Sequence, residues 1–549
     1  MLYYGLVSVS QSQTVYVPAD YWVYDFLDRL ESKQVLPVVL NGTRPMTRIE
    51  IAEHLKVIIE QNPALDRVER EQLDFLRFEF QEELAEKADV NYPSRIHSLT
   101  KNRWIDPWLP DFIYPQGRHF FEIDHGPLRA RWDPIFLRSR MTADDDTVKK
   151  NERVNIDTNG FLLWGTLGKL VGYYADVRDT REWGTRLYPG GNATAPRLGF
   201  VQGNTRQIYH DETIAYVTLQ KRWALLMFGK GVNLWGPGRF GQLMLSDYAT
   251  SYDQLKFQIT LPRLKFTSMI SWLRAYSPDY YFGADSRRMM TAHRLEFAPF
   301  RRITFGLQET VVFSPKNFEA GYANPVMFFR SAEHYYGDNG NAAMGVDAKL
   351  KLIRNVKLYG ELFIDDLMTG KLGTPYYGNK YGYTIGCHYT DWLRVPQLDL
   401  FLEYSRIRPY TYSHKSPESV YQHFSTVLGH WIGPNSDLLT GSMTFRTSRR
   451  LQFICTTQYR RHGANPPDRN VGGDVDRPHQ IQTDSLDAVF LDGLLNTIWS
   501  WKMNVRYEAL RNLYFKVGLG WEQRRIQNDS KENLQQSRRE LELSFQFNF

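Results

Sequence analysis

The end of the sequence, Arg538–Phe549, alternates between apolar and polar residues. One parity is apolar and holds Leu541, Leu543, Phe545, Phe547 and Phe549. The other parity is polar and holds Glu540, Glu542, Ser544, Gln546 and Asn548. A period of two places these two sets on opposite faces of a β-strand. The segment therefore predicts an amphipathic strand that runs to Phe549.

Two segments before it repeat the pattern on either side of a tight turn predicted at 510–512. Their apolar faces are rich in aromatic residues and carry no charge: Trp499, Trp501, Met503, Val505, Tyr507, Leu513, Phe515, Val517, Leu519 and Trp521. The opposite faces carry Lys502, Arg506, Glu508, Lys516 and Glu522. A soluble antiparallel sheet also alternates, but lipid accepts no charge at mid-depth whereas a barrel lumen accepts many. The two faces therefore favour strands of an all-β, antiparallel transmembrane barrel.

Connections of unequal length separate the strand-like segments from residue 118 onward. Short turns are predicted near 166–169, 220–222, 262–263, 299–302, 354–355, 392–396, 448–450 and 510–512. Long connections are predicted near 138–151, 181–207, 234–252, 277–288, 314–340, 367–377, 407–437, 461–495 and 525–535. Residues 420–431 could form one more strand, but a long loop would then lie on the side of the short periplasmic turns and the number of strands would be odd. Treating 407–437 as one outer loop predicts a barrel of about 18 strands over 118–549, with short periplasmic turns and both barrel ends periplasmic.

The residues before the barrel do not show the period-two alternation of the predicted strands. Residues 1–13 hold a short apolar stretch without a basic flank, and we interpret them as the remnant of an export signal. Residues 14–90 predict a small periplasmic helical domain, with Asp20 capping the first helix, a capping box at Thr47–Glu50 opening the second and Pro63 starting the third. Residues 91–117 form a connector rich in Pro and Trp.

The segment Tyr16–Leu55 looks like one S-layer-homology repeat, a type of module that binds cell-wall polymers. Such repeats usually act as several copies, so a compact packing module is the simpler interpretation of a single one. Cell-wall binding through the N-terminal helices stays open as an alternative.

Composition and motifs exclude several classes of function. The chain has 549 residues and a formal net charge of +6 without a basic cluster, which gives little support for nucleic-acid binding. No apolar run reaches the roughly 18 residues of a spanning helix. Gly236–Gly241 matches G-x-G-x-x-G, but it contains a proline and lacks a βαβ context. Cys387 and Cys455 have no metal-ligand spacing. We therefore expect no enzyme activity, no cofactor and no metal.

Three loop stretches are more distinctive: Lys230–Arg239, which contains Trp-Gly-Pro-Gly; Asn324–Arg330, which begins Asn-Pro-Val-Met; and Arg408–His414, which contains Pro-Tyr-Thr-Tyr-Ser-His. Together they resemble the capsule-assembly Wzi family, whose members carry elements of this kind. The resemblance implies an outer-membrane barrel with a small periplasmic helical part. It also implies a lectin-like protein that binds capsular or related polysaccharide and anchors it at the cell surface.

Other partners follow from the predicted barrel. The lipid bilayer and lipopolysaccharide would surround it. A last strand that ends in phenylalanine is the usual form of the signal that the bacterial barrel-insertion machinery reads.

Glycan binding needs aromatic faces for sugar C–H surfaces and fixed polar groups for hydroxyls or carboxylates. The predicted outer loops supply both, and the candidate glycan-binding residues are Trp235, Arg239, Tyr248, Arg408, Tyr410, Tyr412, His414, His430 and Trp431. Arg239 and Arg408 suit an acidic polymer because a guanidinium grips a carboxylate through two parallel hydrogen bonds. Two alternatives stay open. The same side chains could pack the loops into a plug, and the charged lumen equally suits a porin or substrate channel.

Overall fold

The computed structural model describes residues 15–84, 118–146, 150–188, 191–195, 197–274, 287–527 and 533–548. The expected export-signal remnant (1–13), the connector (91–117) and Phe549 lie outside these ranges.

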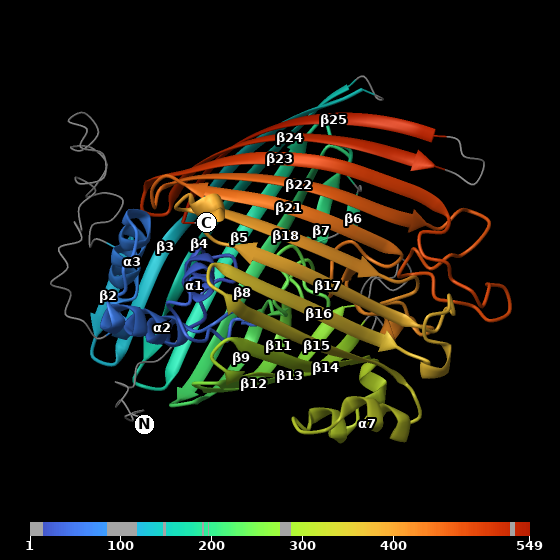
Figure 1. The fold of residues 1–549 in the computed structure, drawn as a ribbon, viewed down its shortest axis with the longest axis horizontal. Helices are drawn as coiled ribbons and strands as arrows, with labels where there is room; N and C mark the ends of the chain where they lie inside the picture. The colour runs from blue at the N-terminus through green and yellow to red at the C-terminus, as the bar shows by residue number, and fades with distance from the viewer. Residues whose placement is uncertain are drawn as a thin grey trace.

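Strands of the described chain form a closed antiparallel barrel (Figure 1). Eighteen of them form the ring: β3 (Leu128–Asp145), β4 (Lys150–Leu167), β5 (Val171–Gly184), β8 (Gln207–Lys221), β9 (Ala224–Gly231), β11 (Tyr252–Leu261), β12 (Leu264–Arg274), β13 (Arg287–Phe300), β14 (Ile303–Phe313), β15 (Gly340–Ile353), β16 (Val356–Asp366), β17 (Lys380–Tyr389), β18 (Leu398–Ile407), β21 (Ser436–Arg446), β22 (Leu451–Ala464), β23 (Leu494–Leu510), β24 (Leu513–Gln527) and β25 (Asn533–Phe547). β25 pairs with β3 and closes the ring. The predicted fold and strand number are confirmed.

Shorter strands complete the sheet. β2 (Phe121–His125) pairs with the first part of β3, and β25 pairs with the rest of the same edge. β6 (Gly191–Ala195) and β7 (Gly199–Asn204) form a hairpin beside β8. Two further pairs lie apart from the ring: β1 (Thr43–Arg44) with β10 (Leu234–Trp235), and β19 (Gln422–His423) with β20 (Thr426–Val427).

The predicted alternation of faces is confirmed in the last strands. Leu541, Leu543 and Phe545 of β25 are exposed on the outside of the barrel. Glu542, on the opposite face, meets two lysines across the lumen side, with Nζ–carboxylate distances of 3.0 Å to Lys502 and 3.1 Å to Lys516. The apolar face therefore points outward and the ionic face inward, as a barrel in lipid requires.

One predicted loop is wrong. Residues 138–151 are mostly strand, since β3 runs to Asp145 and β4 starts at Lys150, with Asp144 opposite Asn151. Arg138 and Arg140 share the outward parity of Phe136 but are polar. The apolar–polar alternation therefore stops while the strand continues. A polar outer face is what a strand shows where it extends beyond an apolar belt.

The described residues before the barrel include four helices: α1 (Val23–Ser32), α2 (Arg48–Gln61), α3 (Arg67–Glu79) and α4 (Gln81–Leu84). The capping box of Thr47 and Glu50 is confirmed. The predicted start at Pro63 is wrong, because Asp66 caps α3 through a second capping box with Glu69. The predicted cap by Asp20 is also wrong, because Trp22 occupies the N-cap of α1 without a side-chain bond. None of the described helices is long and apolar enough to cross a membrane.

We call residues 15–84 the helical unit. It lies at the end of the barrel with the short connections, which we call the turn end (Figure 1). The backbone N–H of Asn355, in the turn between β15 and β16, donates to the carbonyl of Ser32. Arg67 donates to the carbonyl of Thr447, in the turn between β21 and β22. The other end is the loop end.

The helical unit contacts inward-facing side chains from strands around the ring. These side chains, each with its partner in the unit, are Arg131 of β3 (Glu82), Trp164 of β4 (Arg48), Tyr216 of β8 (Tyr16), Lys265 of β12 (Glu50), Glu296 of β13 (Gly42), Lys349 of β15 (Asn41), Lys351 of β15 (Glu31), Lys357 of β16 (Asp28) and Asp399 of β18 (Arg29). The helices therefore plug the lumen at the turn end.

The two halves of the lumen differ in packing. Along β11–β18 and β21, the packed half, inward side chains such as Lys265 are buried, with a side-chain exposure of 0%. Along β22–β25, the open half, inward side chains such as Lys502 stay partly accessible, with a side-chain exposure of 41% for Lys502.

Candidate functional site

Two long connections, 232–251 and 408–435, fold into the lumen. Their apolar residues join inward side chains of β12–β16 in one buried cluster that includes Leu243, Met244, Tyr421, Met290 and Phe363. Aromatic residues in a loop sequence thus serve as core. Because of this packing, several predicted site residues are buried in the lumen.

Trp235, Tyr412 and His430 are fully buried. Trp235 lies in β10 opposite Thr43 of the helical unit. The hydroxyl of Tyr412 donates to the carbonyl of Leu243 at 2.8 Å. Burial lowers the pKa of His430 to about 3, so its imidazole is neutral at ordinary pH. These three side chains pack the inward loops, and a ligand does not reach them in this conformation.

Arg239, Tyr248 and Trp431 come together at a pocket of about 550 Å³, which we call the lumen pocket. It lies between the start of the helical unit and the inward loop 232–251, and its remaining lining residues are Ala19, Asp20, Tyr21, Tyr24, Asp25, Arg44, Arg197, Leu234, Gly238, Phe240, Gly241, Gln242, Ser246 and Asp247. This size lies within the usual range of small-molecule sites. Three predicted candidates therefore share one cavity.

Arg239 is already neutralised in this pocket. Its guanidinium forms two hydrogen bonds with the carboxylate of Asp25 in α1. Burial alone would raise the pKa of Asp25, but the charge and hydrogen bonds of Arg239 lower it to about 2. Arg239 therefore ties the loop to the helical unit, and its charge is satisfied within the protein.

Two other arginines of the pocket carry free positive charge. Neither Arg44 nor Arg197 has a carboxylate within ion-pair distance in the described residues. Arg44 donates to the carbonyl of Asn41 at 3.1 Å and lies over the ring of Tyr24. Arg197 lies 5.6 Å from the ring centroid of Tyr248. Because a guanidinium is always charged, these two side chains can take up an anionic group beside aromatic faces.

The pocket borders the open half of the lumen. Arg460 of β22 lies 5.5 Å from the ring centroid of Trp431. Arg178 of β5 lies near Asp20 of the pocket. The wall next to the pocket thus belongs to strands whose inward side chains remain partly accessible.

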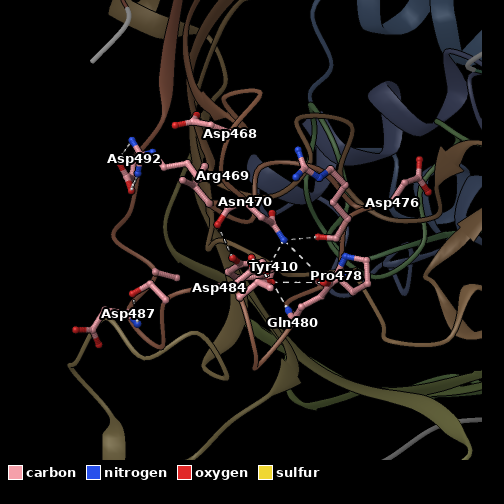
Figure 2. Close-up of a pocket in the computed structure, with 15 residues that line it drawn as sticks. Tyr410, Asp468, Arg469, Asn470, Asp476, Pro478, Gln480, Asp484, Asp487 and Asp492 are labelled. Carbon is pink, nitrogen blue, oxygen red and sulfur yellow. Dashed lines mark hydrogen bonds and ion pairs between the residues drawn. The ribbon is translucent and has the colours of Figure 1, made fainter. Parts of the chain in front are cut away.

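A second pocket, of about 530 Å³, lies in the loop between β22 and β23, and we call it the crown pocket. Figure 2 shows Asn470 near its centre, with Tyr410 and Asp484 beside it. The hydroxyl of Tyr410 donates to the carbonyl of Asn470 at 2.9 Å. The charged lining residues are Asp468, Asp476, Asp484, Asp487, Asp492, Arg469 and Arg477. Five carboxylates against two guanidiniums make this pocket unsuited to an acidic ligand.

The two remaining candidates lie in neither pocket. Arg408 donates to the carbonyl of Thr374 at 3.4 Å and lies over the ring of Tyr381. His414 accepts a hydrogen bond from the backbone N–H of Ser416, and burial lowers its pKa to about 4. No group of three or more His, Cys, Asp or Glu side chains in the described part of the chain could hold a metal ion.

Sequence reasoning missed Arg44 and Arg197. Arg44 belongs to the helical unit, and Arg197 follows β6 in a connection expected to be an outer loop. The loop that carries Arg197 bends inward, where its backbone N–H donates to Thr426 Oγ1 at 3.0 Å. Nothing in the sequence links these two positions.

Comparison with the solved structure of one outer-membrane protein supports the fold. The outer-membrane protein Wzi of Escherichia coli, described as a carbohydrate-binding β-barrel involved in group 1 capsule assembly, is 15% identical with a TM-score of 0.57, and the alignment covers 97% of this chain and 99% of that chain. OprD of Pseudomonas aeruginosa is 10% identical with a TM-score of 0.39, over 76% of this chain and 95% of that chain. OccAB1 of Acinetobacter baumannii is 10% identical with a TM-score of 0.40, over 76% and 96%.

None of the curated proteins matches the sequence. The family model described as "Capsule assembly protein Wzi" matches residues 190–538, which is more than half of the chain. The expected resemblance and the outer-membrane barrel are both confirmed. This chain therefore belongs to the Wzi family of outer-membrane capsule assembly proteins.

Proposed function

We propose that this protein binds an exported polysaccharide without chemical turnover and holds it at the cell surface. The barrel is the anchor in the outer membrane, and the helical unit lies on the periplasmic side. The family supports this role, and E. coli Wzi, which shares the fold, is described as carbohydrate-binding.

The observation that carries the proposal is the lumen pocket. Arg44 and Arg197 offer two guanidiniums that pair with no carboxylate of the described residues, and the rings of Tyr248 and Trp431 lie in the same cavity. Guanidiniums bind a sugar carboxylate through paired, charge-assisted hydrogen bonds. The aromatic rings supply flat apolar surface for the C–H face of a sugar ring. An acidic sugar unit of the polymer is therefore the proposed ligand.

Binding of an acidic polysaccharide to the purified protein in detergent tests this site. The Arg197→Ala variant removes one charged donor from an exposed position, and we expect affinity to fall about tenfold. The matched control is Arg206→Ala, which removes the same charge from the nearby turn between β7 and β8, where Arg206 donates to the carbonyl of Thr185. Equal affinities of the two variants would argue against the lumen pocket.

Chemical reduction of the carboxylates on the polymer tests the ligand class. The neutral product should bind the native protein and the Arg197→Ala protein equally weakly. If the neutral product binds as tightly as the acidic polymer, hydroxyl recognition at the crown pocket becomes the better explanation. Asp487→Asn and Asn470→Ala variants would then locate the site.

Deletion of the gene tests the anchoring role in cells. We expect exported polysaccharide to move from the cell surface into the medium, and restoration of the native gene to return it. Unchanged attachment after deletion would refute the function itself.

The alternative function, a porin or substrate channel, needs a continuous aqueous path. The helical unit contacts inward side chains from β3 to β18 at the turn end. We therefore expect a purified barrel in a planar bilayer to be silent. A steady open conductance would favour transport.

A further inference from the structure

The connection between β14 and β15, residues 314–339, does not follow the inward course of 232–251 and 408–435. It contains η2 (Pro315–Asn317), η3 (Ala320–Ala323) and the short helix α7 (Phe329–Tyr335). Figure 1 shows α7 outside the ring of strands, beside β14. The Asn324–Arg330 stretch singled out in the sequence lies in this connection, which we call the wall loop.

The wall loop covers a polar patch on the outer face of the barrel. On β13 the even residues point inward, since Arg294 and Glu296 contact the helical unit. His293 therefore points outward, and so does its cross-strand partner Glu309. Their side chains lie 3.1 Å apart (His293 Nε2 to Glu309 Oε2). Uncovered, this pair would face lipid, where charged groups are destabilising.

Phe329 of α7 shields this pair. Its ring stacks on His293 with centroids 4.3 Å apart, and its backbone N–H donates to Glu309 at 3.0 Å. Glu333 of the same helix accepts a hydrogen bond from the backbone N–H of Ala342 in β15. The inner side of the wall loop is therefore fixed to the barrel wall by polar and aromatic contacts.

The pairing of strands shows which outward-facing side chains lie beside this patch. Trp272 of β12 lies opposite Met289 of β13, which lies opposite Phe313 of β14. Met289 and Phe313 are buried under the wall loop, whereas Trp272, at the same level, is 42% exposed on the outer face. Tryptophan at such a position is typical of the membrane interface. The wall loop thus lies next to an exposed, outward-facing tryptophan of the barrel wall.

The wall loop exposes three large apolar or aromatic side chains, alongside polar ones that include Lys316, Glu319, His334 and Asp338. Val326, Phe328 and Tyr335 are 84%, 54% and 86% exposed. Asn324 creates the local turn, because its Oδ1 accepts the N–H of Val326 and its carbonyl accepts the N–H of Met327. The turn projects Val326 away from the barrel. Large exposed apolar side chains next to a lipid-facing belt extend that belt.

We propose that the wall loop is a membrane-interface segment that inserts Val326, Phe328 and Tyr335 into the outer leaflet of the membrane. Its partner is lipid, with acyl chains meeting Val326 and Phe328 and the Tyr335 ring at the polar boundary. The Asn324–Arg330 stretch then contributes to seating the barrel in the membrane. This proposal goes beyond polysaccharide binding and does not depend on it.

Fluorescence quenching of the full-length protein in lipid bilayers tests the proposal. Cys387 and Cys455 are the cysteines of the chain, and both are replaced by serine. A single cysteine at position 326 (Val326→Cys) then carries an environment-sensitive fluorophore. Position 326 is highly exposed, so the barrel should fold, as checked by heat-modifiable migration in gels.

Two matched labels calibrate the result: Leu307→Cys on the outer face of β14, and Asp487→Cys in the crown pocket. Lipids with a quencher near the headgroup should quench the label at 326 at least about threefold more than the label at 487. Iodide in solution should quench the label at 487 more strongly than the label at 326.

Two outcomes would overturn the proposal. Quenching of the label at 326 by iodide and not by lipid would place the wall loop in water. Protection from both quenchers, together with a dimer in native mass spectrometry, would assign this face to a second copy of the chain. A Phe328→Asn variant gives an independent check, since it should reduce the lipid quenching at 326 without changing it at 307.

Discussion

The packed and open halves of the barrel have the same alternation of apolar and ionic residues. Their inward-facing charged side chains differ in how far they are exposed to solvent. In the packed half, Lys265 meets Glu50 of the helical unit with its side chain fully buried. In the open half, Lys516 meets Glu542 at a similar distance while facing an accessible lumen. The first pair is a structural contact between two parts of the protein, and the second borders solvent.

This difference explains why an ionic inner face does not identify a channel. A charge on an inward parity is compatible with lipid-spanning strands whether water or a plug lies beside it. What separates the two cases is the partner, and the partners of the packed half come from residues 15–84 and from the inward loops. The following variants test that contrast, from the largest expected effect to the smallest.

Removal of Arg29 should have the largest effect. Its guanidinium binds Glu69, Asp391 and Asp399, and the Arg29 side chain is buried. Arg29→Ala removes the one buried cation that these carboxylates share, although Lys33 and Arg446 remain beside them. The expected cost is about 3–5 kcal/mol. We expect the helical unit to detach from the folded barrel, which limited proteolysis and thermal unfolding would measure.

Lys56→Ala is the matched control in the same unit, because Lys56 pairs with Glu53 on the surface of α2. Its cost should stay below about 1 kcal/mol. Equal protease resistance of the Arg29 variant and the native protein would refute the structural role of the packed-half ion pairs.

Acid should weaken the same docking. Burial opposes ionisation of Glu79 and Glu82, but neighbouring arginines lower the pKa of each to about 2. A carboxylate with a lowered pKa contributes stability that is complete above its unfolded value of about 4.3 and is lost as the pH falls through its folded value. Protease sensitivity of the helical unit should therefore be constant from pH 7 to about 5 and rise toward pH 2. A rise between pH 8 and 6 would contradict this assignment.

Loss of one buried hydroxyl should have a moderate effect. Tyr412→Phe removes the hydrogen bond to the Leu243 carbonyl and leaves that carbonyl buried without its donor, at a cost of about 1–3 kcal/mol. Tyr459→Phe is the control on the outer face of β22, where the ring is exposed, and it should leave the melting temperature unchanged. Equal melting temperatures would mean that the inward loops are not part of the cooperative core.

Removal of Lys516 should have the smallest effect. Glu542 retains Lys502 at 3.0 Å, and the site is partly exposed, so Lys516→Ala should cost less than about 1 kcal/mol. Lys265→Ala is the comparison in the packed half, where Glu50 would lose a buried partner and the cost should be several-fold larger. Thermal unfolding of both variants in one detergent measures the difference, and equal costs would erase the distinction between the halves.

Local patterns predicted local structure well. Period-two alternation predicted the outward face of Leu541–Phe545, and the Thr47–Glu50 spacing predicted a helix start, because both depend on neighbours in sequence. The strand at Arg138–Asp145 was missed because its outward side chains are polar. A rule that recognises strands by an apolar face does not detect a strand segment in which both faces are polar.

The site was only partly predictable. Arg239, Tyr248 and Trp431 share a cavity, but Trp235, Tyr412 and His430 have the same loop-like sequence context and lie in the core. Whether a loop bends inward depends on contacts with distant strands, which no local pattern records. Arg44 and Arg197 meet in the lumen pocket only because residues far apart in the chain fold to the same place.

The short strand β2 has a consequence for how the cylinder closes. It covers Leu128–Trp132 of the β3 edge, and β25 takes up the same edge from Phe136 onward. Between them, Asn548 donates to the carbonyl of Pro134 and the backbone N–H of Phe120 donates to Asp133. The final strand therefore meets an occupied edge if it slides toward the turn end. β2 thus limits how far β25 can shift along β3 at the seam of the folded barrel.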